Sequence, residues 1–100
     1  MAVGEAGVPR KTVQVRIEGR VQGVWYRGWA VQEALTRGLA GWVRNRSDGS
    51  VEAMFSGPKD VVDAMLEACW QGPPAARVSR VTSSPAPEPE TPGFHPMATL

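Results

Sequence analysis

Features of membrane proteins and of disulfide-bonded secreted proteins are missing from this sequence. Its 100 residues include one cysteine, Cys69, so no internal disulfide can form. No charge-free apolar run reaches the roughly 18 residues of a transmembrane helix, and residues 1–11 lack the apolar core of a secretory signal. We therefore expect a cytoplasmic protein with no membrane partner, in which Cys69 packs as a small apolar side chain.

Histidine and cysteine, which often bind metal ions, occur only once each. The only histidine, His95, lies between Phe94 and Pro96 in a proline-rich stretch, where no catalytic role is expected. The sequence contains no spacing of Cys, His, Asp or Glu that is typical of a metal site. We therefore predict that the protein binds no metal and needs no cofactor.

Acidic residues are rare in the first half of the chain, although the net charge is only +1. Between Arg10 and Arg46, eight basic residues stand against two acids, whereas from Ser47 onward three basic residues stand against seven acids. A basic segment of this kind attracts an anion. Charge alone does not distinguish a small phosphate compound from RNA, and it also fits charged residues that only keep strands and a helix soluble.

Apolar and polar side chains alternate in four places, as they do in half-buried strands. The predicted strands are Thr12–Glu18, Gly41–Asn45, Ser50–Ser56 and Arg77–Thr82. Asp48-Gly49 is a strong turn dipeptide, so the second and third strands are expected to form a hairpin. In the third strand Val51, Ala53 and Phe55 alternate with polar or exposed positions, which places Phe55 in the core.

Two helices are predicted between these strands. The first covers residues 26–37, and its buried face is expected to carry Tyr26, Ala30 and Ala34, which recur at every fourth position. The second begins with the glycine–proline pair at residues 57–58. The proline is expected in the first helical turn, where its missing N–H group costs nothing.

The predicted order of elements is β-α-β-β-α-β within one domain. This order is typical of the ferredoxin-like α+β fold, an antiparallel sheet with two helices on one face. We expect the domain to cover residues 12–100 and residues 1–11 to form a flexible extension.

The end of the chain is rich in proline. Five of the nine prolines lie between Pro85 and Pro96, so residues 83–93 are expected to form an extended connector. A short last strand is predicted near residues 94–97. Because Pro96 has no backbone donor, such a strand could lie only at a sheet edge.

The stretch GRVQGVWYR, residues 19–27, places a cation where one is usually unfavourable. Gly19 and Gly23 indicate a turn into the first helix, and Arg27 falls in the first turn of that helix. A helix N-terminus is already positive, so Arg27 would be repelled there unless an anion were bound. Converging N–H groups and a guanidinium together suit a phosphate group. The residues alone leave open a solvent-exposed Arg27 beside glycines that only form the turn.

Two sequence motifs resemble those of the acylphosphatase family. The first, G-x-V-Q-G-V-x-F/Y-R, is matched by residues 19–27, and the second, G-aromatic-V-x-N-x3-G-x-V-x5-G, by residues 41–57. The second motif contains Asn45, which by itself would be interpreted as an ordinary turn residue. The resemblance extends from about residue 13 to residue 81, and the proline-containing end departs from the regular last strand of the family.

The resemblance implies hydrolysis of the carboxyl–phosphate bond of acyl phosphates, giving carboxylate and inorganic phosphate. It implies that Arg27 and Asn45 are catalytic, with Arg27 holding the phosphoryl group and the Asn45 side chain orienting the attacking water. Since an amide does not titrate near neutral pH, Asn45 can position water but cannot act as a base. Loop N–H groups are implied to hold the phosphoryl group as well, those of Arg20, Val21, Gln22, Gly23, Val24, Trp25 and Tyr26.

The expected partner is a small-molecule acyl phosphate, with inorganic phosphate as product and inhibitor, and we expect a monomer. Two other functions fit parts of the pattern. The same element order occurs in RNA recognition motifs, but the third strand lacks their run of exposed aromatics, so no nucleic-acid partner is expected. A non-catalytic domain that binds an anion or acyl phosphate for regulation is the alternative function. The four tryptophans are expected mainly to pack, and Trp25 and Trp42, which flank the two motifs, are also candidates to wall the pocket around an acyl group.

Overall fold

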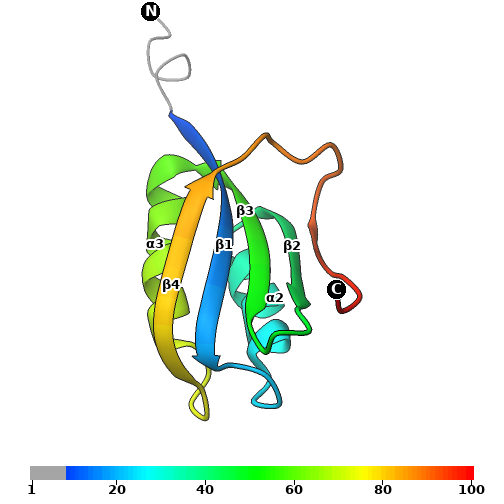
Figure 1. Ribbon diagram of the computed structural model, residues 1–100. Helices are drawn as coiled ribbons and strands as arrows, with labels where there is room; N and C mark the ends of the chain where they lie inside the picture. The colour runs from blue at the N-terminus through cyan, green and yellow to red at the C-terminus, as the bar shows by residue number, and fades with distance from the viewer. Residues whose placement is uncertain (1–8) are drawn as a thin grey trace, which may run out of the picture.

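The computed structural model describes residues 9–100, so most of the expected N-terminal extension, residues 1–8, lies outside the described residues. In chain order the elements are β1 (Arg10–Arg20), α2 (Tyr26–Thr36), β2 (Ala40–Asn45), β3 (Val51–Pro58), α3 (Lys59–Gln71), β4 (Arg77–Pro85) and β5 (Phe94–Pro96). Figure 1 shows both helices on the same face of a single sheet.

The sheet has five strands in the order β4-β1-β3-β2-β5. Neighbouring strands are antiparallel from β4 to β2, which confirms the predicted ferredoxin-like α+β fold. The one difference is β5, which pairs with β2 in parallel, so the sheet is not wholly antiparallel. β5 lies at an edge of the sheet, as expected for a strand that contains Pro96.

The core between the sheet and the helices is made by the side chains that the periodicity indicated. On α2 the buried residues are Tyr26, Ala30 and Ala34, and on α3 they are Val62, Met65 and Cys69. Strand β3 contributes Val51, Ala53 and Phe55, which are fully buried. Burial of Cys69 confirms its interpretation as a packed thiol, and burial of Phe55 removes it as a platform for an RNA base.

Strands β1 and β3 extend further than predicted at one end of the sheet. Arg10 pairs with Pro58 and Lys11 with Gly57, so β1 begins two residues before Thr12, within the expected flexible extension. Pro58 is therefore the last residue of β3, and its ψ of 140° is extended rather than helical. Helix α3 begins at Lys59, and the prediction that Pro58 occupies its first turn was wrong because the partner strand continues the sheet pairing.

The proline-rich segment is also shorter than expected. Ser83, Ser84 and Pro85 continue β4 through their pairing with β1, so the connector begins only after Pro85. Its far end is fixed by Phe94, whose ring stacks on Phe55 with 5.5 Å between ring centroids. Beyond Pro96 the backbone N–H of Met97 donates to the Val43 carbonyl at 2.8 Å, which keeps the segment on the edge of β2.

A buried carboxylate ties three strands together on the sheet face that the helices leave uncovered. Glu52 is 7% exposed and accepts hydrogen bonds from Arg44 Nε at 2.8 Å, from Arg46 Nη1 at 2.9 Å and from Gln14 Nε2. Burial by itself raises the pKa of Glu52, but these hydrogen bonds outweigh it and hold the pKa below its ordinary value of 4.5. The carboxylate is therefore ionised at neutral pH and contributes to stability.

Glu52→Gln should lower the free energy of unfolding at neutral pH by about 2 kcal/mol, because it leaves two partly buried arginines without their carboxylate. Since the folded pKa is depressed, this contribution is present above the ordinary pKa and is lost as the pH falls through the folded pKa. In urea unfolding, the free energies of unfolding of the wild type and Glu52→Gln should therefore become more similar as the pH is lowered. Glu88→Gln, at an exposed carboxylate paired with Arg10, is the control and should change stability by less than about 0.5 kcal/mol. A difference in the free energy of unfolding between the wild type and Glu52→Gln that stayed the same in acid would contradict this account.

Candidate active site

The two sequence motifs meet because of the strand order. Strands β1 and β2 both run antiparallel to β3, which lies between them, so their carboxyl ends lie at the same end of the sheet. The loop that follows β1 and leads into α2 therefore lies beside Asn45, the last residue of β2. Figure 1 shows the β1–α2 loop and the β2–β3 hairpin side by side at this end.

The loop between β1 and α2 leaves its backbone donors free. Within the described part of the chain, none of the N–H groups of residues 22–28 donates a hydrogen bond to the protein. Helix α2 begins after Trp25 without a side-chain cap. Gly23 turns the loop with a φ of 74°, a conformation that glycine adopts without strain. A cluster of unpaired N–H groups at a helix N-terminus is suited to an anion.

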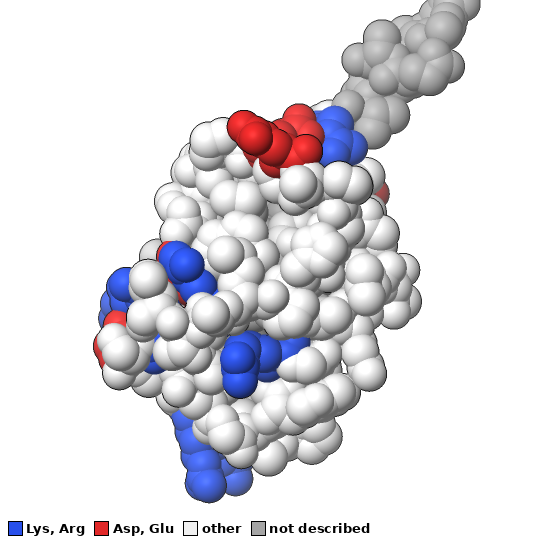
Figure 2. Space-filling view, turned by 90° about the vertical axis from the view of Figure 1, so that its right-hand side faces the viewer, with Lys and Arg blue, Asp and Glu red and all other residues white. Residues whose placement is uncertain are grey.

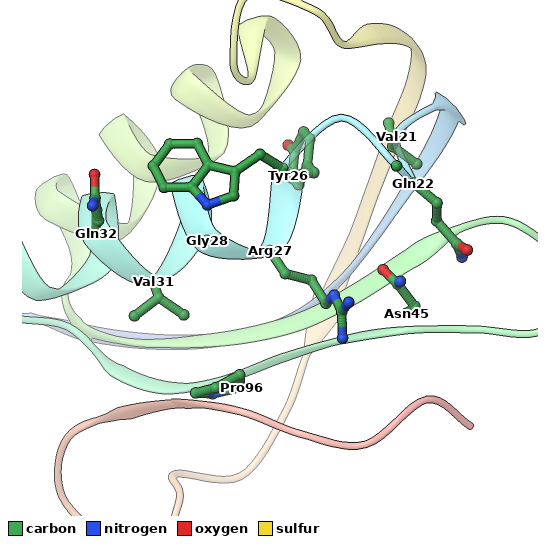
Figure 3. Close-up of a pocket in the computed structure, with 11 residues that line it drawn as sticks. Val21, Gln22, Tyr26, Arg27, Gly28, Val31, Gln32, Asn45 and Pro96 are labelled. Atoms are coloured by element: carbon green, nitrogen blue, oxygen red, sulfur yellow. The ribbon is translucent and has the colours of Figure 1, made fainter.

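Arg27 adds a full positive charge to this helix end. It is exposed, the first turn of α2 contains no acid, and among the described residues it forms no ion pair and no side-chain hydrogen bond. Asn45 is half-buried, and its side-chain amide likewise has no hydrogen-bond partner among these residues. Figure 3 shows the two side chains pointing toward one another from α2 and β2. Both polar groups are therefore available to a ligand in the space between them.

A pocket of about 500 Å³ lies at this point. Seven of the predicted site residues line it: Val21, Gln22, Gly23, Trp25, Tyr26, Arg27 and Asn45. Arg20, the last residue of β1, and Val24, which packs against the core, do not. On the side of the molecule shown in Figure 2, basic side chains lie in a hollow within a largely uncharged surface. Of the described residues that line the pocket, only Arg27 is charged.

Four lining residues were not predicted from the sequence: Gly28, Val31, Gln32 and Pro96. Val31 follows Arg27 by four positions on α2, and Gln32 follows Gly28 by four, so helical spacing places them along the pocket. That spacing could have identified them once Arg27 was chosen. Pro96 enters from β5, whose pairing with β2 was not fixed by the sequence.

Comparisons with known proteins identify the family of this chain. The family model described as acylphosphatase matches residues 13–96. An acylphosphatase of Rhodospirillum rubrum is 58% identical over 90% of this chain and 99% of its own length. One of Azorhizobium caulinodans is 51% identical over 89% and 97%. The chain belongs to the acylphosphatase family. The solved structure of an acylphosphatase from Coxiella burnetii, 33% identical, superposes with a TM-score of 0.84 over 88% of this chain and 93% of that one.

Within this acylphosphatase-family fold, Gln22 joins the two motifs. Its side-chain Nε2 donates to the backbone carbonyls of Arg46 and Ser50, both at 2.8 Å. Those carbonyls flank the turn that follows Asn45. Gln22 thereby fixes the loop against the hairpin, a role that sequence reasoning missed because its acceptors are backbone atoms.

The two tryptophans that flank the motifs lie in different places. Trp25 lines the pocket, as expected, and is 58% exposed. Trp42 is not among the described residues that line the pocket, so the lining does not support this candidate role for Trp42. Its neighbour Val43 is buried in the core, so strand alternation turns Trp42 to the opposite face, where the Arg44 guanidinium lies 4.8 Å from its ring centroid.

The Tyr26 hydroxyl and the Cys69 thiol are both held in their neutral forms. Burial raises the pKa of the Tyr26 hydroxyl far above its usual range, and this hydroxyl donates to the Cys69 carbonyl at 2.7 Å. Burial also raises the pKa of the Cys69 thiol to about 12. Neither group is therefore placed to act as a nucleophile. Residues 9–100 contain no group of three or more His, Cys, Asp or Glu positioned to hold a metal ion, and no helix among them is long and apolar enough to cross a membrane.

Proposed function

We propose that this protein hydrolyses acyl phosphates to a carboxylate and inorganic phosphate. The observation that supports this most strongly is a single pocket lined by the loop, by Arg27 and by Asn45, in which the loop N–H groups, the guanidinium and the side-chain amide have no hydrogen-bond partner among residues 9–100. The Arg27 and Asn45 side chains point toward one another there. The N–H groups and the guanidinium suit the dianionic phosphoryl group, and the amide suits a neutral water molecule. Family membership and the acylphosphatase relatives support the same activity.

The loop and Arg27 bind the phosphoryl oxygens in this proposal. Arg27 binds two of these oxygens through its planar fork of donors, and the N–H groups of the loop bind the others. The guanidinium and the N–H groups already lie around the phosphoryl oxygens, which carry the negative charge during transfer. They therefore need no rearrangement as the reaction proceeds. An acyl phosphate already has a good leaving group, so positioning and charge stabilisation supply most of what the reaction requires.

Water attacks phosphorus directly. The Asn45 side-chain oxygen accepts a hydrogen bond from the water, whose oxygen forms a bond to phosphorus as the bond from phosphorus to the acyl oxygen breaks. The carboxylate leaves with that electron pair, and the proton lost by the water passes to phosphate or solvent. No Cys, His, Asp, Glu, Ser or Thr is among the described residues that line the pocket, which argues against a phosphoryl-enzyme intermediate.

The test is hydrolysis of benzoyl phosphate, followed by loss of its ultraviolet absorbance, in the presence of a metal chelator. We expect turnover that chelator does not abolish and that inorganic phosphate inhibits competitively. A folded protein that binds phosphate saturably but hydrolyses neither benzoyl phosphate nor acetyl phosphate would contradict the proposal and favour the non-catalytic alternative. A folded protein that binds no phosphate would contradict both.

Gln22→Ala should lower kcat/KM about tenfold while the fold is retained, because the loop loses its two bonds to the hairpin and the donors are no longer held in one position. Gln22→Glu keeps the shape but cannot donate to the two carbonyls and adds negative charge beside the phosphoryl group. It should be more damaging than Gln22→Ala. The measurement is steady-state hydrolysis with circular dichroism as the folding control. Equal activity of both variants and the wild type would show that the loop is positioned without Gln22.

A further inference from the structure

The pocket extends beyond the groups that would hold phosphate. Past Arg27 its lining continues as an uncharged region, which we name the acyl groove: Trp25, Gly28, Val31, Gln32 and Pro96. In Figure 3 the Val31 side chain points from α2 toward Pro96, so these two apolar residues face each other across the groove. Figure 2 shows uncharged surface around the basic hollow on this side of the molecule.

Trp25 is held in the groove by its backbone and by Gly28. It is the only non-glycine residue with positive φ among residues 9–100, at φ 68° and ψ 25°. Its indole lies directly on Gly28, where an added Cβ would come within 2.1 Å of the indole Nε1. A large apolar side chain is thus kept 58% exposed at the pocket. Strained, exposed positions of this kind are concentrated at ligand sites.

None of the described residues that form the acyl groove carries a charge that could bind a charged acyl chain. Among residues 9–100, Arg27 is the one charged residue that lines the pocket, and a bound phosphoryl group would offset its charge. A carboxylate on the acyl chain would lose hydration in the groove without gaining a cation. An apolar ring would instead be removed from water against the Trp25 indole, Val31 and Pro96, and flat rings pack well on indole.

We propose that the acyl groove is a subsite that selects acyl phosphates with an uncharged, apolar and preferably aromatic acyl group. This inference rests on the proposed function, because it assigns the acyl part of a substrate whose phosphoryl part lies in the loop. Trp25 determines this specificity through its side chain, whereas its backbone N–H belongs to the phosphate loop. Acyl phosphates that carry a second carboxylate are disfavoured substrates.

The test compares kcat/KM for benzoyl, acetyl and succinyl phosphate, which differ in the apolar ring and in the extra carboxylate. For the wild type we expect kcat/KM to be about tenfold higher for benzoyl phosphate than for acetyl phosphate. The difference between benzoyl phosphate and succinyl phosphate should be larger still. In Trp25→Ala the benzoyl-to-acetyl ratio should fall severalfold. Trp70→Ala, at a tryptophan on α3 that is 50% exposed and outside the pocket lining, is the matched control and should leave the ratio unchanged.

A gain-of-function variant tests the charge argument. Gln32 is exposed on α2, so Gln32→Lys should fold normally and supply the missing cation. We expect it to raise kcat/KM for succinyl phosphate relative to benzoyl phosphate severalfold, with a smaller effect at high salt because the new charge is screened.

A benzoyl-to-acetyl ratio unaffected by Trp25→Ala would overturn the proposal, as would a wild type that prefers succinyl phosphate.

Binding of two unreactive analogues separates this proposal from the hydrolase activity. Phenacylphosphonate and acetonylphosphonate present an aromatic and a methyl group on the same phosphonate head, and calorimetry measures their affinities. Tighter binding of the phenacyl compound that is lost in Trp25→Ala supports the groove, even if no acyl phosphate is hydrolysed. Hydrolysis of all three acyl phosphates with equal kcat/KM, together with equal affinities for the analogues, would uphold the enzyme and overturn the groove.

Discussion

Arg27→Ala should lower kcat/KM for benzoyl phosphate by about 10³-fold or more, the range seen when an arginine that neutralises transferring phosphoryl charge is removed. The side chain has no partner of its own among the described residues, so its loss disrupts no ion pair there. Arg27→Lys retains the charge but not the planar pair of donors, and it should recover only part of the activity. Steady-state kinetics of the three proteins measures this, and a loss below about tenfold in Arg27→Ala would place the phosphoryl group elsewhere.

The same substitution should leave the protein slightly more stable. A cation in the first turn of α2, where no acid offsets it, opposes the helix dipole, so its removal should raise the free energy of unfolding by about 0.5 kcal/mol. Inorganic phosphate should stabilise the wild type in proportion to its binding and stabilise Arg27→Ala much less. Activity that falls while stability rises cannot be attributed to unfolding, and thermal melts with and without phosphate provide this control.

Asn45→Ala should lower kcat by about 10²–10³-fold with little change in KM, because water positioning acts in the transition state while phosphate binding is retained. Asn45→Asp keeps the size and an acceptor but loses the donors and brings a negative charge beside the phosphoryl group. The decrease in kcat for Asn45→Asp should be at least as large as for Asn45→Ala, and its KM should be raised. Kinetics of both variants, with circular dichroism as the folding check, measures the two parameters separately. An Asn45→Ala variant whose KM rises and whose kcat is unchanged would make Asn45 a binding residue instead.

The spacing of apolar residues along the sequence was sufficient to predict which faces of the helices and strands are buried. The fourfold spacing of Tyr26, Ala30 and Ala34 identified the buried face of α2, and the same spacing fixed the helix turn on which Arg27 lies. Strand alternation placed Phe55 in the core. Alternation also determines the face of Trp42, since its neighbour Val43 is buried, and this favours a packing role for Trp42 over a place in the pocket wall.

Features that depend on pairing between distant segments were predicted less well. Pro58 remains in β3 because Arg10 lies opposite it, and Ser83 remains in β4 because Val15 does. Neither partner can be inferred from the residues next to the boundary. Gln22 bonds to backbone carbonyls across the site, and Pro96 reaches the pocket only because β5 pairs with β2. These contacts have no local sequence signal.

The central claim is that the loop N–H groups and Arg27 together hold a phosphoryl group beside Asn45. The most direct measurement is a titration of ¹⁵N-labelled protein with inorganic phosphate, followed by amide resonances in two-dimensional NMR. The account predicts saturable shifts that are largest for the backbone amides of residues 22–28 and for the Asn45 side-chain amide, with a Kd that matches inhibition by phosphate and with loss of binding in Arg27→Ala. Shifts centred on other basic residues, or unchanged binding in Arg27→Ala, would contradict it.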